Sequence, residues 1–107
     1  MSTAHPVADF LTHLAVERQA SAHTLDAYRR DLAALSQWAG ARDLLTLCGD
    51  DLRAFIASEH RRKLSAKTLQ RRLSACRSLY RWQLKHGHIH SDPCAGVRAP
   101  KAARNLP

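Results

Sequence analysis

The sequence predicts an all-α fold built from four helices, and three observations support this prediction. Apolar residues recur at intervals of three and four in four separate stretches, which is the spacing of a helix that buries one face. No stretch alternates apolar and polar residues as a half-buried strand does. Ser, Asp, Pro and Gly residues stand where such helices should begin and end. We therefore expect one helical domain in this chain of 107 residues.

The first two helices are expected over residues 6–18 and 21–40. Pro6 suits the first turn of the earlier helix, whereas Ser21 is placed as the N-cap of the later one and Gly40 as its stop. The apolar stripes of these helices are formed by Val7, Phe10, Leu11 and Leu14, and by Leu25, Tyr28, Leu32, Leu35 and Ala39.

The third and fourth helices follow a short connector. Asp50 and Asp51 suit the positive end of a helix dipole, and we expect that helix to end near Lys63. Ser65 is placed as the N-cap of the fourth helix, which Gly87 ends in the left-handed conformation. The expected buried residues are Leu52, Phe55 and Ile56 in the third helix, and Leu69, Leu73, Cys76, Leu79, Tyr80 and Leu84 in the fourth.

The chain changes character after the fourth helix. A capping Asp92 before Pro93 predicts a single helical turn that reaches Val97. The segment after this turn has prolines and cations and little to bury, which is typical of an exposed linker. We therefore expect a helical domain over residues 1–98 and a linker over residues 99–107.

Several classes of protein are disfavoured by the composition. No stretch approaches the roughly 18 consecutive apolar residues of a membrane span, and no secretory signal is evident, so we expect a soluble cytoplasmic protein without a membrane partner. Cys48, Cys76 and Cys94 lack zinc-ligand spacing and are expected to be free thiols, and the seven histidines do not form a metal set. No hydroxyl or thiol has an identifiable base. We expect no catalytic residue, metal, cofactor or small-molecule substrate.

Positive charge is concentrated in the second half of the chain. Residues 1–59 hold five basic and eight acidic side chains, a net charge of −3, whereas residues 60–107 hold twelve basic and one acidic, a net charge of +11. These values sum to the total of +8. A concentrated positive field attracts polyanions, and nucleic acid is the commonest such partner of an intracellular domain.

The expected fourth helix carries this charge opposite its apolar arc. Six residues lie within about 40° of the first of them on a helical wheel, and we call them the cationic ridge: Lys67, Arg71, Ser74, Ser78, Arg81 and Lys85. A solvated helix face usually mixes charges of both signs, because like charges four residues apart repel each other. The ridge has one sign interleaved with small hydroxyls, which favours contact with a phosphate backbone and leaves guanidinium groups for guanine edges.

The ridge has other interpretations. It could be a plain solvated face or a surface for an acidic protein partner; a membrane-bound helix is disfavoured, because the apolar side is needed for the core. A second phosphate site is expected at the first turn of the second helix, where Ser21, His23 and Thr24 offer free amides and hydroxyls. The same residues also suit a cap with no further role.

Three segments resemble one known family. They are "FLTHLAVERQASAHTLDAYRRDLAALSQW" from residue 10, "LSAKTLQRRLSACRSLYRW" from residue 64 and "GHIHSDPCAGVRAPKAARNLP" from residue 87. Together they are similar to the N-terminal core-binding domain of bacterial Xer tyrosine recombinases, XerC more than XerD, over nearly the whole chain. The most specific motifs are Ser-x-x-Thr-Leu-x-x-Tyr from Ser21, Ser-x-x-Thr from Ser65 with Arg-Leu-Ser-Ala from Arg72, and Pro-x-x-Gly-Val-Arg-Ala-Pro-Lys from Pro93. The family usually has Asn where this chain has Asp92, and either residue caps a helix.

The resemblance implies a SAM-like, orthogonal four-helix bundle that binds one face of a duplex DNA half-site. It also implies that the recombinase's catalytic residues belong to a C-terminal domain that would start near Leu106 and is absent from this chain. In the family the second and fourth helices meet DNA, and the first helix contacts a neighbouring protomer, here XerD-like. Carried over by position, the DNA-binding residues are Ser21, His23, Thr24, Tyr28, Lys67, Thr68, Arg71, Arg72, Ser74 and Arg77.

We therefore hypothesise a sequence-specific DNA-binding domain of a site-specific tyrosine recombinase, acting in chromosome dimer resolution or DNA integration. Tyr28 has a second expected place, because the helical wheel also directs it toward the core. The alternatives are a helical module that docks an acidic protein partner and the equivalent domain of a phage or integron integrase.

Overall fold

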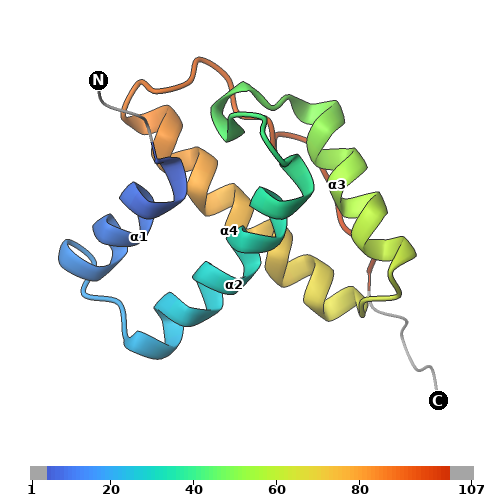
Figure 1. The fold of residues 1–107 in the computed structure, drawn as a ribbon, viewed down its shortest axis with the longest axis horizontal. Coiled ribbons are helices and arrows are strands. Elements are labelled where there is room, and N and C mark those ends of the chain that lie inside the picture. The colour runs from blue at the N-terminus through green and yellow to red at the C-terminus, as the bar shows by residue number, and fades with distance from the viewer. Residues whose placement is uncertain (1–4, 102–107) are drawn as a thin grey trace.

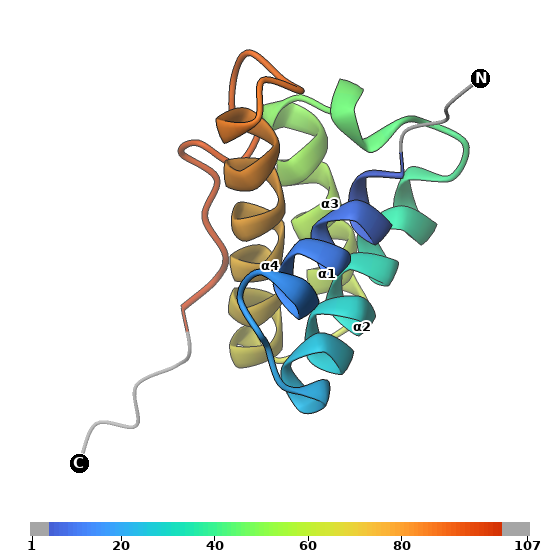
Figure 2. The same cartoon turned by 90° about the vertical axis from the view of Figure 1, so that its left-hand side faces the viewer.

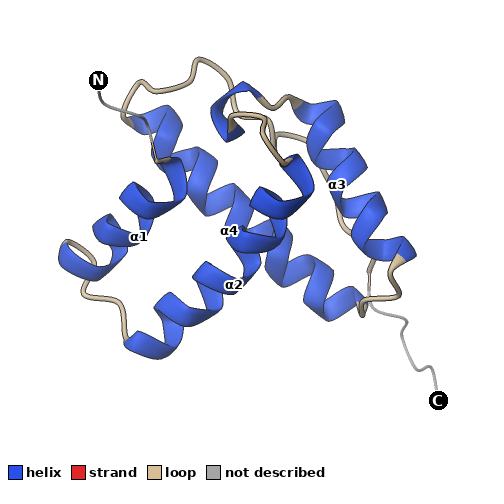
Figure 3. Ribbon diagram, in the orientation of Figure 1, coloured by secondary structure: helices blue, strands red, loops and turns tan. Residues whose placement is uncertain are grey.

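Four α-helices and one short 3-10 helix make up residues 5–101, the part of the chain that this computed structural model describes. The elements are α1 (Pro6–Val16), α2 (Ala22–Ala39), η1 (Leu44–Thr46), α3 (Gly49–Arg61) and α4 (Ala66–Lys85). No strand is present among the described residues (Figure 3). The all-α prediction is therefore confirmed.

Helix α4 is the centre of the bundle and packs against the other three α-helices. α2 and α4 cross each other, with α1 beside one arm of the crossing and α3 beside the other (Figure 1). The chain after α4 turns back and runs beside that helix (Figure 2). This crossed arrangement leaves one side of α4 free of the other helices.

The predicted caps are confirmed at both long helices. The Ser21 hydroxyl accepts a hydrogen bond from the Thr24 amide at 3.1 Å, and the Ser65 hydroxyl accepts one from the Thr68 amide at 3.1 Å. Such bonds satisfy amides that have no partner within the helix. After α4 the backbone reverses at Gly87 with φ of 74°, a conformation that glycine adopts without steric cost.

Two predicted helix ends are about two residues too long. α1 ends at Val16 rather than Arg18, because the backbone turns at Gln19 with φ of 51°. α3 ends at Arg61, and the predicted end at Lys63 instead has φ of 65°. In both places a non-glycine residue adopts the left-handed conformation, which hydrophobic spacing does not reveal.

The segment after α4 packs onto the core. The Asp92 carboxylate accepts a hydrogen bond from the Cys94 amide at 2.8 Å, and the Asp92 carbonyl accepts one from the Ala95 amide at 3.1 Å. These bonds form a hydrogen-bonded turn over residues 93–96, where the sequence predicted one turn of helix. The turn places Cys94 and Val97 in the interior. Most of the predicted linker, residues 102–107, lies outside the described residues.

The core is largely the predicted one, with one exchange on α4. Leu84 was expected to be buried but is 38% exposed, whereas the neighbouring Gln83 is 1% exposed. The Gln83 amide donates to the Pro6 carbonyl at 3.2 Å, and its oxygen lies 2.7 Å from Nδ1 of His88. A polar side chain occupies this interior position because it joins the start of α1 to the loop after α4.

Two remaining features concern the cysteines and the helix lengths. The three cysteines are free thiols, as predicted, and burial raises the pKa of Cys94 to about 12.

Within the described range, none of the helices combines the length and the apolar character needed to cross a membrane.

Candidate nucleic-acid interface

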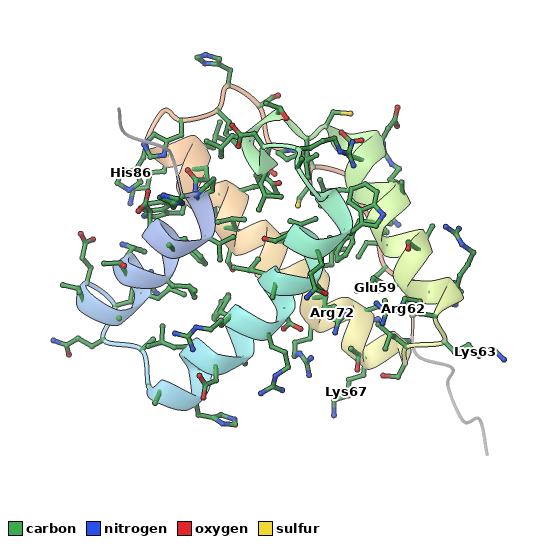
Figure 4. All side chains as sticks on the ribbon, in the orientation of Figure 1. Glu59, Arg62, Lys63, Lys67, Arg72 and His86 are labelled. Atoms are coloured by element: carbon green, nitrogen blue, oxygen red, sulfur yellow. The ribbon has the colours of Figure 1, made fainter. Side chains whose placement is uncertain are left out.

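The cationic ridge lies on the side of α4 that faces solvent. Five of its six residues are exposed, and Ser78 is half-buried. No carboxylate is present on α4, so no residue of the helix itself neutralises the ridge. Lys67 extends away from the bundle at the N-terminal end of the helix (Figure 4). The ridge is therefore a row of accessible cations on a rigid support.

A groove of about 230 Å³ lies between the start of α2 and the ridge. Its lining residues are His23, Thr24, Ala27, Tyr28, Asp31, Arg71, Ser74 and Ala75. Five of the predicted DNA-binding residues thus meet at one groove, three from α2 and two from α4. Ser21 caps the same end of α2. The crossing of the two helices brings these residues together from distant parts of the sequence.

Tyr28 packs partly against the core and partly lines the groove. Its ring packs edge-on against Phe10 with the ring centroids 5.8 Å apart, and its hydroxyl donates to the Ser78 hydroxyl at 3.4 Å. The side chain is half-buried and also lines the groove. It therefore joins the core to the ridge.

Asp31 holds the guanidinium group of Arg71 by two parallel hydrogen bonds. The Nε and Nη2 atoms of Arg71 donate to the two carboxylate oxygens of Asp31, each at 3.0 Å. Asp31 is 2% exposed, whereas the Arg71 side chain is 50% exposed. These hydrogen bonds raise the pKa of Arg71, so the guanidinium stays charged. One edge of Arg71 is fixed to the protein interior, and the rest of the group faces outward.

Arg72 lies between two buried carboxylates. Its guanidinium donates to Glu59 of α3, and its Nε atom lies 3.4 Å from Asp31 of α2. Arg62 approaches the same Glu59 carboxylate from the end of α3 at 3.2 Å (Figure 4). The sequence places Arg72 among the DNA-binding residues, but in the structure its side chain is 15% exposed and joins three helices.

The other two predicted residues of α4 make contacts within the domain. Nη2 of Arg77 donates to the Val97 carbonyl at 2.8 Å, which fastens the returning segment to α4. Thr68 is half-buried, and its hydroxyl accepts a hydrogen bond from Ser65 at 3.0 Å. Arg77 thus joins α4 to the returning segment, whereas Thr68 completes the cap of its own helix.

Sequence reasoning missed the two carboxylates that organise this surface. Asp31 and Glu59 are 2% and 3% exposed. Glu59 follows Phe55 and Ile56 by four and three residues, so it lies on the buried stripe of α3, and Asp31 precedes Leu35 by four residues on α2. A carboxylate in register with an apolar stripe is a signal that could have identified both, because a buried charge requires a partner.

Three histidines near the C-terminal end of α4 lie around the ring of Trp82. The ring centroids of His13, His86 and His88 lie 5.3, 4.7 and 5.9 Å from that of Trp82. Over residues 5–101, no group of three or more His, Cys, Asp or Glu side chains is arranged to hold a metal ion.

Replacing Arg72 with methionine should destabilise the domain. The change leaves two buried carboxylates with one partner fewer each, and breaking a buried ion pair in this way costs about 3 kcal/mol or more. We expect this loss in the free energy of unfolding from urea titrations followed by circular dichroism. The matched control is Arg81→Met on the exposed ridge, which should change stability by about 0.5 kcal/mol or less. Equal stability of the two variants would contradict the structural role of Arg72.

Comparison with known proteins supports the same fold and family. Residues 7–87 match the family model described as "Phage integrase, N-terminal SAM-like domain". The chain is 61% identical, over 99% of its length, to "Tyrosine recombinase XerC" of Xanthomonas campestris pv. campestris (strain B100). It is 57% identical over 94% of its length to the XerC of Xylella fastidiosa (strain M23), and 48% identical over 92% to that of Pseudomonas aeruginosa (strain LESB58).

These matches cover 33–35% of the relatives' own lengths. The chain thus spans about a third of the curated proteins that it resembles. Its four crossed helices agree with the SAM-like architecture that the family model describes. The chain therefore belongs to the phage integrase N-terminal SAM-like domain family and is an XerC-like member of it.

Proposed function

We propose that this chain binds duplex DNA as the N-terminal domain of a site-specific tyrosine recombinase. The observation that carries the proposal is the exposed cationic ridge of α4 beside the open groove at the start of α2. A row of cations along one helix suits a phosphate backbone, because each contact releases counterions from the DNA. The relatives named tyrosine recombinase support the assignment to DNA.

The predicted residues divide into two roles. Lys67, Arg71 and Ser74 are exposed on α4, and Ser21, His23 and Thr24 are exposed at the start of α2, so these six are proposed to contact DNA, with Tyr28 at the groove between them. Amides at a helix N-terminus favour phosphate oxygens. Arg72 and Arg77 are proposed to support the interface by holding α4 against its neighbours, and Thr68 by completing the cap at the start of α4.

The activity of the whole protein is a further part of the proposal. The named relatives are about three times as long as this chain. We assign cleavage and rejoining of DNA to the part of such a protein that the chain does not span. We place the function in chromosome dimer resolution or DNA integration, together with an XerD-like protomer. Since the chromosome is the proposed partner, the site of action is the cytoplasm.

The proposed contact with a second protomer uses α1. Val16 at the end of this helix is 69% exposed, and it is one of two large apolar side chains that are exposed among the described residues. An exposed apolar residue gains free energy when a protein partner removes it from water. We therefore assign Val16 to the contact between neighbouring recombinase protomers.

Binding to duplex DNA should depend steeply on salt. We expect the logarithm of the binding constant to fall linearly with the logarithm of potassium chloride concentration, with a slope of about −0.9 for each phosphate neutralised. Lys67→Ala should reduce the magnitude of this slope by about 0.9, because it removes one phosphate contact. Fluorescence anisotropy of a labelled duplex measures both quantities.

The control for this titration is Arg53→Ala, which removes the same charge from α3. Arg53 lies outside the ridge and pairs with Asp50 at 3.1 Å. Its slope should equal that of the unmodified chain. Affinity that does not change with salt, or an equal effect of the two variants, would refute the proposed surface.

Association of the chain with itself should depend on Val16. Sedimentation equilibrium over a range of protein concentrations is expected to reveal weak self-association that Val16→Glu abolishes, because the introduced charge would have to be desolvated. Leu84→Glu, at the other exposed large apolar residue of the described chain, should leave the association unchanged. A chain that stays monomeric throughout, or a Val16→Glu variant that associates normally, would exclude a Val16 contact between copies of this chain.

A further inference from the structure

We propose that Asp31 and Arg71 form a guanine-reading pair, in which Asp31 positions Arg71 and Arg71 determines the DNA base preference. This inference rests on the proposed function, because it concerns a residue of the same surface. It goes beyond that function by assigning sequence recognition to one side chain and a positioning role to a buried carboxylate. Three features of the structure support it.

The first feature is the choice of Arg71 donors that bind Asp31. A guanidinium has five N–H donors, and the two that Asp31 accepts come from Nε and Nη2 of Arg71. This side-on pairing leaves both N–H groups of Nη1 and one of Nη2 without a partner among the described residues. The free donors of Nη1 and Nη2 form the end of the fork, which matches the O6 and N7 acceptors of guanine in the major groove.

The second feature is the rigidity of the support. Asp31 is 2% exposed, and Nε of Arg72 lies 3.4 Å from the Oδ1 atom of the same carboxylate. Burial and the second nearby cation therefore disfavour movement of the carboxylate into solvent together with Arg71. A side chain fixed before binding loses less conformational entropy on contact than a free one, so the outward edge of Arg71 is preorganised.

The third feature is the contrast with the other cations of the ridge. Lys67, Arg81 and Lys85 make no hydrogen bond or ion pair with any described residue and are exposed. Exposed cations without a partner in the domain suit phosphates, which carry no sequence information. Arg71 alone among the four ridge cations is held by a buried carboxylate, and it borders the groove of about 230 Å³ that small residues such as Ser74 and Ala75 leave open. The geometry separates one base-reading cation from three phosphate-binding ones.

The test is selection from a duplex library with a randomised segment, by the chain and its variants, followed by sequencing of the bound fraction. The unmodified chain should enrich guanine about tenfold at one position, as a bidentate arginine contact does. Arg71→Lys keeps the charge but loses the fork, so the enrichment at that position should disappear. Asp31→Asn keeps the shape but weakens the hold on Arg71, so the enrichment should also fall. Arg81→Ala should weaken binding to all sequences alike.

The possible results are distinguishable. Guanine enrichment that survives Arg71→Lys overturns the inference, and enrichment that survives in a folded Asp31→Asn variant overturns the role of Asp31. Thermal melting followed by circular dichroism establishes whether Asp31→Asn is folded. If it is not, Arg71→Lys and Arg71→Gln decide whether Arg71 reads guanine, because Arg71 is half-exposed and its replacement should leave the domain folded. Salt-dependent binding without a guanine preference refutes this inference but leaves the proposed function intact, whereas absence of duplex binding refutes both.

Discussion

The ion pairs between α4 and two buried carboxylates set the geometry of this domain. Asp31 of α2 and Glu59 of α3 each lose nearly all contact with water, and arginines at consecutive positions of α4 supply their partners. A buried carboxylate without a partner is costly, so an arrangement of the helices that separated Asp31 and Glu59 from Arg71 and Arg72 would be penalised. Apolar packing alone tolerates many arrangements of helices. We infer that the ion pairs favour the observed arrangement, in which α4 is crossed by α2 and flanked by α3 (Figure 1).

The same interaction connects the fold to the proposed interface. Arg72 is turned inward and joins the helices. Arg71, the residue before it, is held at the boundary between interior and solvent. Because both share Asp31, the orientation of the outward arginine depends on the packing of the inward one. The start of α2 is brought beside the ridge by the same crossing, so that His23 and Thr24 line the same groove as Ser74. Asp31 therefore takes part both in the packing of the helices and in the proposed interface.

Much of the fold follows from local chemistry and could be predicted. Ser21, Ser65 and Gly87 mark helix ends through bonds and backbone angles that depend on neighbouring residues, and the apolar spacing places Leu73 and Leu79 in the core. The ridge follows from the same wheel. Local chemistry does not predict ion pairs between residues that are far apart in the sequence. Arg71 lies 40 residues from Asp31 and Arg72 lies 13 residues from Glu59, so a wheel drawn for α4 treats both arginines as free cations.

The central claim is that the cations on the outer side of α4 form a surface for a polyphosphate while the inner side holds the bundle together. Amide chemical shifts of the isotopically labelled chain, recorded while duplex DNA is added in dilute buffer, test this claim most directly. The account predicts that resonances of Lys67, Arg71 and Ser74 move together with those of the first turn of α2. Resonances of this ridge that stay unchanged while DNA is added would contradict it.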